Sequence, residues 1–473
     1  MIGRAPAASA RSGATFTVRD VLRALPQFHE HHAVVAWWQA RTGTLFAHFT
    51  PERRRMLLSV AGLGVLADMV ARALRKADGA GASVWPAVTV FVVVLAALYG
   101  CYLAADRFKS LPSAVQRRPQ VALHLGFWGM LAVVWMLPRD GGAWAAAPVA
   151  MAMLLPFYLW RCGYLLKSGQ RGHAAGTRFV DHLFYLSPVY GGTDTPFGKG
   201  FDHLVRHEAH SGEALARAQL AGVKLLLLAL VWRIAEQVLA GVVYGDPKSP
   251  VTRLVGGYGA HLPRLEHLLT ERPHVPVLVA WGSLYLELVR EVLDHAARGH
   301  VIVGMLRLLG FNVFRNTYKP LLAESLVDFW NRYYYYFKEL LVDFFFYPTF
   351  ARRFRRWPRM RIVTATFAAA FLGNMYYHSL AQDQLLLRGA LWPALAVLRS
   401  RTFYCFLLAV GISVSMLREQ RRRGTASAPG GLRRAGRIAC VWTFFAIIHI
   451  WNVGGTASFA RRTRFFASLF GLA

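Results

Sequence analysis

Long apolar runs are the feature that most constrains how this chain can fold. An α-helix rises 1.5 Å per residue, so about 20 apolar residues are needed to cross the hydrocarbon core of a bilayer. Seven runs approach that length: Val84 to Ala104, Val121 to Leu137, Trp144 to Trp160, Leu220 to Tyr244, Ile362 to Leu380, Phe403 to Leu417 and Ile438 to Val453. Charged residues interrupt two further runs, Met56 to Leu74 and Val275 to Val292. The runs predict an all-α, polytopic transmembrane bundle with about nine to eleven crossings.

The composition excludes an ordinary soluble domain. Hydrophobic residues make up 55% of the 473 residues and charged residues only 17%, whereas soluble domains carry about 25% charged residues. The mean hydropathy of +0.32 agrees with this. We expect residues 1–50 to form a polar, amphipathic tail without the apolar core of a signal peptide, and residues 51–473 to form one multi-pass membrane domain.

Basic residues give the chain a formal net charge of +30. The arginines cluster in short loops between apolar runs, as the positive-inside rule predicts, so the expected partner is a lipid bilayer and not nucleic acid. The loops from Arg352 to Arg361 and from Arg418 to Arg437 should both be cytoplasmic. By this count Arg461, Arg462 and Arg464 would fall outside, so either a crossing is miscounted or the tail folds back. Ala- and Arg-rich usage without a targeting peptide suggests a bacterial inner membrane.

The stretch from Leu321 to Phe350 combines charged and aromatic residues near bilayer depth. Its ionisable side chains include Asp328, Arg332, Lys338, Glu339 and Asp343. Charges in this setting are costly and usually face a bundle interior or a water-filled pocket, so they mark a functional site. The alternative is an interfacial helix whose aromatic rings lie at headgroup level while its charges reach the water. The stretch alone leaves both interpretations open.

A short motif within this stretch indicates a family. Asp328-Phe329-Trp330 is followed by Arg332, and then by Asp343 and Pro348. The pattern resembles the D-F-W-x-R signature of the membrane-bound O-acyltransferase family, alginate O-acetylase branch. An upstream segment is similar to that family in an ungapped register, through Asp294, Gly304, Arg307 and Leu308-Leu309-Gly310-Phe311. The resemblance covers about residues 156–380 and implies a family-like helical core there.

A histidine in the next apolar run is the second landmark of this resemblance. Gly373-Asn374-Met375-Tyr376-Tyr377-His378 lies within Ile362 to Leu380, where the family carries its catalytic histidine. The resemblance implies that His378 is a general base. Imidazole titrates near neutrality, so it can take the proton of an acceptor hydroxyl as that oxygen attacks a thioester carbonyl. For an isolated histidine, the alternative would be a structural role with the ring held by hydrogen bonds.

Further site residues follow from the same resemblance. The family's second polar partner, a His or Asn, is replaced by Tyr334. Tyr334, Asn331 or Asn374 could donate a hydrogen bond to the oxyanion that develops in the reaction. For substrate binding we expect contributions from four residues: Asp328, Trp330, Arg332 and Asp294.

The implied reaction is acyl transfer from an acyl-CoA, with acetyl-CoA as the expected co-substrate and no permanently bound cofactor. The implied acceptor is a hydroxyl of a cell-surface or exported glycan, which allows for a periplasmic partner that receives the acyl group. Two alternatives stay open. One is an O-acyltransferase acting on a lipid or long-chain alcohol. The other is an inactive relative serving as a transporter or assembly factor, which the substitution at Tyr334 would favour.

Three histidines, His203, His207 and His210, have an H-x3-H-x2-H spacing. On a helix, His203 and His207 would share one face and could bind a metal. An amphipathic juxtamembrane helix with interfacial histidines explains the spacing better, and the implied chemistry needs no metal. We therefore predict no metal site.

Overall fold

The computed structural model describes residues 25–78, 84–137, 144–186, 199–271, 275–422, 430–454 and 457–472. All regular elements in these ranges are helices, apart from a single isolated bridge between Glu208 and Phe311. The prediction of an all-α chain is thus confirmed for the described residues.

Six helices in these ranges are long and apolar enough to cross a membrane. They are α3 (Pro51–Asp78), α4 (Val84–Asp106), α6 (Pro119–Met136), α7 (Ala146–Gln170), α10 (Gly212–Val238) with its π-helical extension η3 (Leu239–Val243), and α20 (Leu391–Arg422). Each coincides with a run predicted from the sequence. Such a set of helices is what a membrane protein requires.

The other three predicted runs are helical but do not meet these limits of length and composition. One lies in α13 (Val277–Leu308), which carries several charges, and one in α21 (Gly431–His449), which begins among arginines. The third is divided among α17 (Pro358–Phe367), the π-helix η6 (Ala368–Gly373) and α18 (Asn374–Ser379). The expected nine to eleven crossings therefore exceed the six helices that qualify in the described part of the chain.

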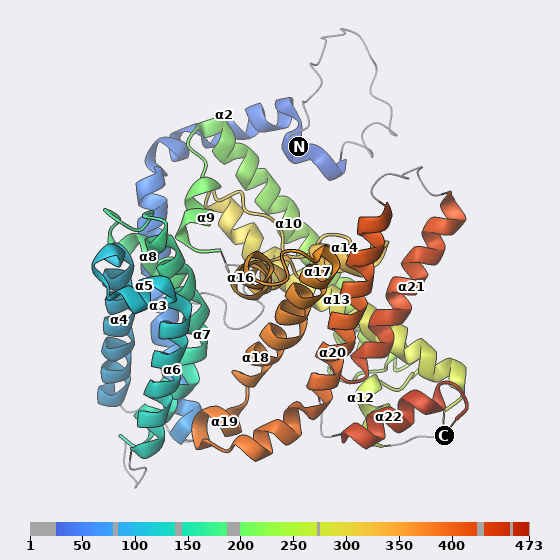
Figure 1. Cartoon of the computed structure of the whole chain (residues 1–473). Helices are drawn as coiled ribbons and strands as arrows, with labels where there is room; N and C mark the ends of the chain where they lie inside the picture. Colours follow the sequence, from blue (N-terminus) through green and yellow to red (C-terminus); the bar gives the residue numbers. More distant parts are fainter. Residues whose placement is uncertain are drawn as a thin grey trace.

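The first helices form one side of the molecule, drawn in blue to green in Figure 1. Here α3, α4, α6 and α7 pack side by side around buried residues such as Leu66, Val94 and Leu154. Short helices connect them or follow them: η2 (Phe108–Ser110), α5 (Ser113–Arg117), α8 (Phe179–Leu186) and α9 (Phe201–Arg206). This side packs against the C-terminal half through α6 and α7.

Residues 25–48 of the predicted tail are η1 (Leu25–Glu30) and α2 (His32–His48), and α2 lies across one end of the molecule in Figure 1. Val35 of α2 packs against Ala216 and Leu220 of α10. The indole N–H of Trp38 donates a hydrogen bond to Gln219 Oε1 at 2.9 Å. This part of the tail is therefore docked on the membrane domain, while residues 1–24 lie outside the described ranges.

The helices α10 and α13 form the most extensive helix pair. Their backbones approach closely because both carry glycine at the crossing: a Cβ atom on Gly222 would lie 2.8 Å from Gly304 O. Small residues allow such close packing where no hydrophobic force drives helices together. The connection between the two helices contains α11 (Pro250–Leu254) and α12 (Leu265–Thr270).

The C-terminal half packs around a second core, in which the rings of Phe329 and Phe445 stack at 3.8 Å. Its remaining elements are η4 (Pro320–Leu322), α14 (Leu326–Tyr333), α15 (Tyr335–Leu341), the π-helix η5 (Val342–Phe346), α16 (Tyr347–Arg352), α19 (Asp383–Arg388) and α22 (Phe459–Ser468). Leu123 and Phe344 pack against both cores, so the two halves form a continuous interior.

The C-terminal arginines have a structural explanation. Arg462 is buried and donates hydrogen bonds to the carbonyl oxygens of Ile450, Val453 and Ala457, at 2.7, 3.0 and 3.1 Å. It thereby satisfies backbone acceptors at and beyond the end of α21. The ten-residue helix α22 is too short to cross a bilayer and packs against α12. The tail therefore folds back, and Arg462 does not report the orientation of the last helix.

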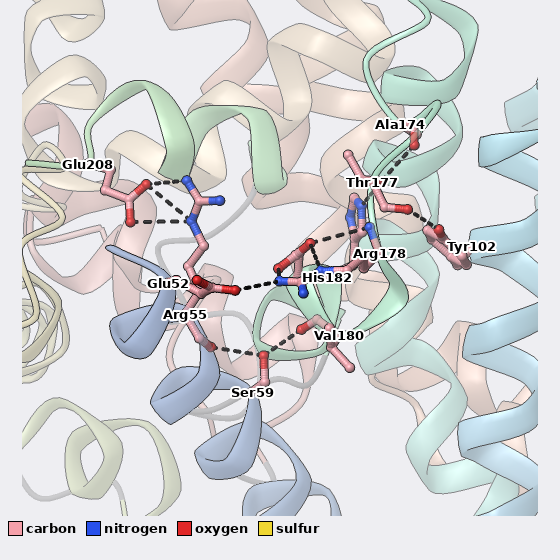
Figure 2. A network of polar contacts seen from close by, with 11 residues as sticks. Glu52, Arg55, Ser59, Tyr102, Ala174, Thr177, Arg178, Val180, His182 and Glu208 are labelled. Atoms are coloured by element: carbon pink, nitrogen blue, oxygen red, sulfur yellow. Dashed lines mark hydrogen bonds and ion pairs between the residues drawn. The ribbon is translucent and has the colours of Figure 1, made fainter. Parts of the chain in front are cut away.

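A polar network joins α3 to segments that lie far away in the sequence (Figure 2). Arg55 Nε lies 3.3 and 3.2 Å from the two carboxylate oxygens of Glu208, whose side chain is fully buried. Its neighbour Arg54 donates to Ala209 O at 2.5 Å. One turn further along α3, Ser59 donates to Val180 O. The start of α3 is thus tied both to α8 and to the segment between α9 and α10.

Candidate functional site

A cavity of about 270 Å³ opens among three groups of helices in the C-terminal half. One wall is formed by α14, α15 and η5, the second by α17, η6 and α18, and the third by α20. Most of the lining is apolar and includes Leu341, Val342, Ala370, Leu408 and Ile412. The volume approaches the lower limit for small-molecule sites, which are usually concave and mostly apolar with a few polar groups.

Two π-helical turns shape this cavity. The segments η5 and η6 pack against each other, and each contributes lining residues. Gly373 makes their approach possible, because a Cβ atom there would lie 2.6 Å from the ring of Phe345. π-Helical turns widen the helix locally and occur frequently at functional sites.

Two buried polar atoms on the cavity wall lack hydrogen-bond partners among the described residues. The Nε1–H of Trp330 is a donor on a side chain that is 8% exposed, and Oδ1 of Asn374 is an acceptor on a side chain that is 2% exposed. A buried polar group without a partner costs about 1–3 kcal/mol. A donor and an acceptor in an apolar cavity are therefore suited to a ligand that carries both kinds of group.

Charged residues line one part of the cavity. Lys338 and Glu339 contribute to its lining, and Glu339 forms ion pairs with both Lys338 and Lys199. Burial favours the neutral form of the Glu339 carboxyl, but hydrogen bonds from Lys199 and Lys338 outweigh it and lower its pKa. Glu339 is thus held as a carboxylate, and the cavity combines an apolar lining with a charged region.

His378 lies one helical turn beyond Asn374 on α18, on the same face of the helix. Its side chain is partly buried, and its ring is 6.2 Å from that of Tyr377. Within the described ranges the imidazole makes no hydrogen bond, although Arg401 of α20 lies within electrostatic reach. The described residues therefore offer no hydrogen bond that would hold the His378 ring in a purely structural role. His378 is not itself among the residues that line the cavity.

The neighbouring residue Tyr376 fixes α18 against α6. Its hydroxyl is 2.7 Å from His124 Nδ1 and accepts a hydrogen bond from Trp128 Nε1 at 3.0 Å. The ring of Trp160 on α7 packs against both His124 and Tyr376. These contacts set the rotation of α18 and hence the direction of Asn374 and His378. No sequence pattern indicates these contacts, because His124 is a single polar residue in an apolar run.

The structure gathers only some of the predicted site residues. Trp330, Asn331 and Asn374 line the cavity, with His378 one turn away. Tyr334 forms the junction between α14 and α15 and is buried outside the cavity lining, where its ring contacts Phe337. A role for Tyr334 in stabilising an oxyanion therefore stays a prediction.

The three charged residues predicted to bind substrate do not line the cavity. Asp328 pairs with Arg332 at 2.7 Å, and its carboxylate also accepts a hydrogen bond from the backbone N–H of Glu324. These contacts stabilise the first turn of α14. Asp294 pairs with Arg298 on its own helix and with Arg233 of α10 at 3.4 Å. The contacts of Asp328 thus hold the start of α14, which carries Trp330 and Asn331, whereas those of Asp294 join α13 to α10.

Sequence reasoning missed several residues around the cavity. Lys199 reaches Glu339 from the N-terminal half, whereas Thr366 and Met416 line the cavity opposite the predicted motif. Thr366 Oγ1 lies 3.3 Å from the sulfur of Met416. None of these residues belongs to a local motif, so only the packing of distant helices reveals them.

Two of the three histidines near α9, His203 and His207, pack ring against ring. The rings of His203 and His207 lie 4.3 Å apart, and burial, followed by the charge of His207, lowers the pKa of His203 to about 3. No group of three His, Cys, Asp or Glu side chains in the described ranges is placed to hold a metal ion.

No protein-family model matches the sequence, and no curated protein matches it at a significant level. The features of this chain that point to a function are therefore its motif and the geometry of its cavity.

Proposed function

We propose that the chain is a membrane-bound O-acyltransferase that moves an acyl group from an acyl-CoA to a hydroxyl group, with His378 as the general base. The observation that carries the proposal is the position of His378 one turn from an apolar cavity with an unpartnered donor and acceptor. Acetyl-CoA is the proposed donor, and a cell-surface or exported glycan is the proposed acceptor. The resemblance of the segment from Asp294 to Pro348 to this family supports the same function.

In the proposed reaction, neutral His378 takes the proton of the acceptor hydroxyl. The hydroxyl oxygen attacks the thioester carbonyl, and the C–S bond breaks as the ester C–O bond forms. The thiolate then takes the proton from the imidazolium, so no net proton is gained or lost. Trp330 Nε1–H and Asn374 are the groups that would orient the substrate, since both lie on the cavity wall.

The proposed setting is a multi-pass protein of the inner membrane, with a family-like helical core and further crossings beyond the six apolar helices. A straight helix from Arg361 to His378 would be about 26 Å long, which would place His378 far from the cytoplasm. In Figure 1, however, α14 and α16 lie well below the upper ends of α20 and α21. A thioester that enters at the level of α14 and α16 would have a shorter path to His378.

A second candidate is an O-acyltransferase that acts on a lipid or long-chain alcohol. The observation that favours it is the mostly apolar lining, to which Leu408, Ile412 and Met416 of α20 contribute. The two candidates share the donor and the base and differ only in the acceptor.

The experiment is an incubation of the purified protein, reconstituted in lipid, with radiolabelled acetyl-CoA and with longer acyl-CoAs. We expect label to move to a glycan acceptor, with release of free CoA. Transfer to a lipid or alcohol instead would select the second candidate. If no donor is consumed with any acceptor, the acyltransferase proposal is wrong and a transporter or assembly factor is favoured.

Replacing Trp330 by Phe tests the donor on the cavity wall. The ring still packs against Phe337, but the N–H is lost, so we expect acyl-CoA binding to weaken by about 5-fold, the effect of one hydrogen bond of about 1 kcal/mol. The control is Trp392→Phe, because Trp392 is 79% exposed and lies outside the cavity lining. Calorimetric titration with a non-hydrolysable acyl-CoA measures both. Equal affinity in the two variants would show that Trp330 does not contact the ligand.

A further inference from the structure

Four basic residues from three segments converge beside η1. Lys224 belongs to α10, Arg307 to the last turn of α13, and Arg315 and Lys319 to the loop that leads to η4. The other three lie within electrostatic reach of Lys224, and the exposed Glu30 is the one acidic residue in this reach among the described residues. We call these four residues the Lys224 cluster. Its local charge is strongly positive.

The Lys224 cluster lacks the carboxylate partners that other half-buried cations have. Lys167, for example, pairs with Asp343 at 2.9 Å. Arg307 instead donates to Val313 O at 3.1 and 2.8 Å, through Nε and Nη2. In the part of the chain that the structure describes, no member of the cluster forms an ion pair with an acid.

Aromatic contacts hold two of the cations together. The guanidinium of Arg315 lies 4.2 Å from the ring centroid of Tyr318, and Lys319 Nζ lies 5.6 Å from it. Lys319 has a left-handed backbone with φ of 48°, which is unfavourable for a residue other than glycine. Burial, followed by the charge of Arg315, lowers the pKa of Arg307 to about 10. Like charges are therefore held close together without a compensating anion.

The surface next to the cluster is apolar and exposed. Leu227 lies almost one turn from Lys224 on α10, Val301 and Met305 precede Arg307 on α13, and Phe314 adjoins Arg315. Since α10 qualifies as a membrane-crossing helix, these side chains are suited to contact lipid tails. Basic pockets between membrane helices bind the headgroups of anionic lipids.

We propose that the Lys224 cluster binds the phosphate of an anionic phospholipid headgroup, with the lipid tails lying along the exposed apolar surface of α10 and α13. A phosphodiester supplies the missing negative charge and accepts charge-assisted hydrogen bonds from Arg315 and Lys224. The apolar surroundings favour a lipid over a soluble phosphate. None of the four cluster residues lines the cavity, and the proposal does not depend on the acyltransferase function.

The test uses the full-length protein, purified in a non-ionic detergent and delipidated. Binding of phosphatidylglycerol and of phosphatidylcholine is measured by native mass spectrometry, and inorganic phosphate and coenzyme A are added as competitors. The double variant Lys224→Gln/Arg315→Gln removes two charges of the cluster. The matched control Arg352→Gln/Arg353→Gln removes two exposed arginines elsewhere. Thermal unfolding in phosphatidylcholine checks that every variant is folded.

We expect the unaltered protein to bind phosphatidylglycerol more tightly than phosphatidylcholine. The cluster variant should bind phosphatidylglycerol about 30-fold more weakly, because each of the two basic residues removed contributes about 1 kcal/mol near the membrane surface. The control should bind as the unaltered protein does. Three results would overturn the proposal: equal binding of both lipids, unchanged binding by a folded cluster variant, or an equal loss in the control. Displacement of the lipid by micromolar phosphate or coenzyme A would also overturn it, in favour of a soluble phosphate ligand.

Discussion

Replacing His378 by Ala is expected to abolish acyl transfer while leaving the protein folded and inserted. Loss of a general base slows such reactions by roughly 10²- to 10⁴-fold. Since the imidazole makes no hydrogen bond within the described part of the chain, its removal should cost little stability. The measurement is the initial rate of product formation from labelled acyl-CoA, together with the thermal unfolding temperature.

His267→Ala is the matched control for this variant. His267 is exposed on the short helix α12 and does not line the cavity. It should retain the full rate. An undiminished rate in the His378→Ala variant would show that His378 is not the general base. If that variant fails to insert, His378→Gln is tested instead, because glutamine keeps the polarity and nearly the size of the side chain.

Replacing Glu208 by Ala should produce the largest loss of stability. The carboxylate is fully buried and pairs with Arg55 (Figure 2). It also lies 3.9 Å from Arg54, whose side chain is only 1% exposed. Without Glu208, a buried guanidinium loses its counter-charge, and α3 loses its link to the segment before α10. Removing one partner of a buried ion pair costs about 3–5 kcal/mol. We expect the free energy of unfolding to fall by this amount in a detergent titration with denaturant.

Glu213→Ala provides the comparison for Glu208. Glu213 pairs with Arg217 one turn away on α10, and both side chains are about half exposed. Such a surface pair contributes only about 0.3–0.5 kcal/mol. Similar losses in the two variants would mean that the network in Figure 2 is not a specific anchor of α3.

The helices could be predicted from the sequence, because the length of an apolar run depends only on consecutive residues. Val84 to Ala104 and Leu220 to Tyr244, for example, coincide with α4 and with α10 plus η3. Where charges or a π-helical turn interrupt the apolar pattern, as in η6, the predicted runs do not meet the limits of length and composition, so these crossings stay predictions. A π-helical turn depends on how neighbouring helices pack, and no residue type in Ala368–Gly373 indicates it by itself.

Only those residues of the candidate site that belong to a local motif could be named from the sequence. Trp330 and Asn331, from the motif, and Asn374, from the run that contains His378, line the cavity. The partnership of Glu339 with Lys199, and of Tyr376 with His124, joins residues far apart in the chain. Contacts of this kind follow from tertiary packing, which hydrophobic periodicity does not predict. The same applies to Asp328 and Arg332, whose charges stabilise α14 and do not line the cavity.

The central claim is that acyl transfer takes place at the cavity between η5, η6 and α20. Ala370 lines it, whereas Leu372 lies on the same π-helical segment and is 59% exposed. The most direct measurement is therefore the rate of acyl transfer by Ala370→Phe, which fills the cavity, compared with Leu372→Phe, which adds the same ring on the outside. We expect transfer to be lost in the first variant and retained in the second. Full transfer by a folded Ala370→Phe protein would contradict it.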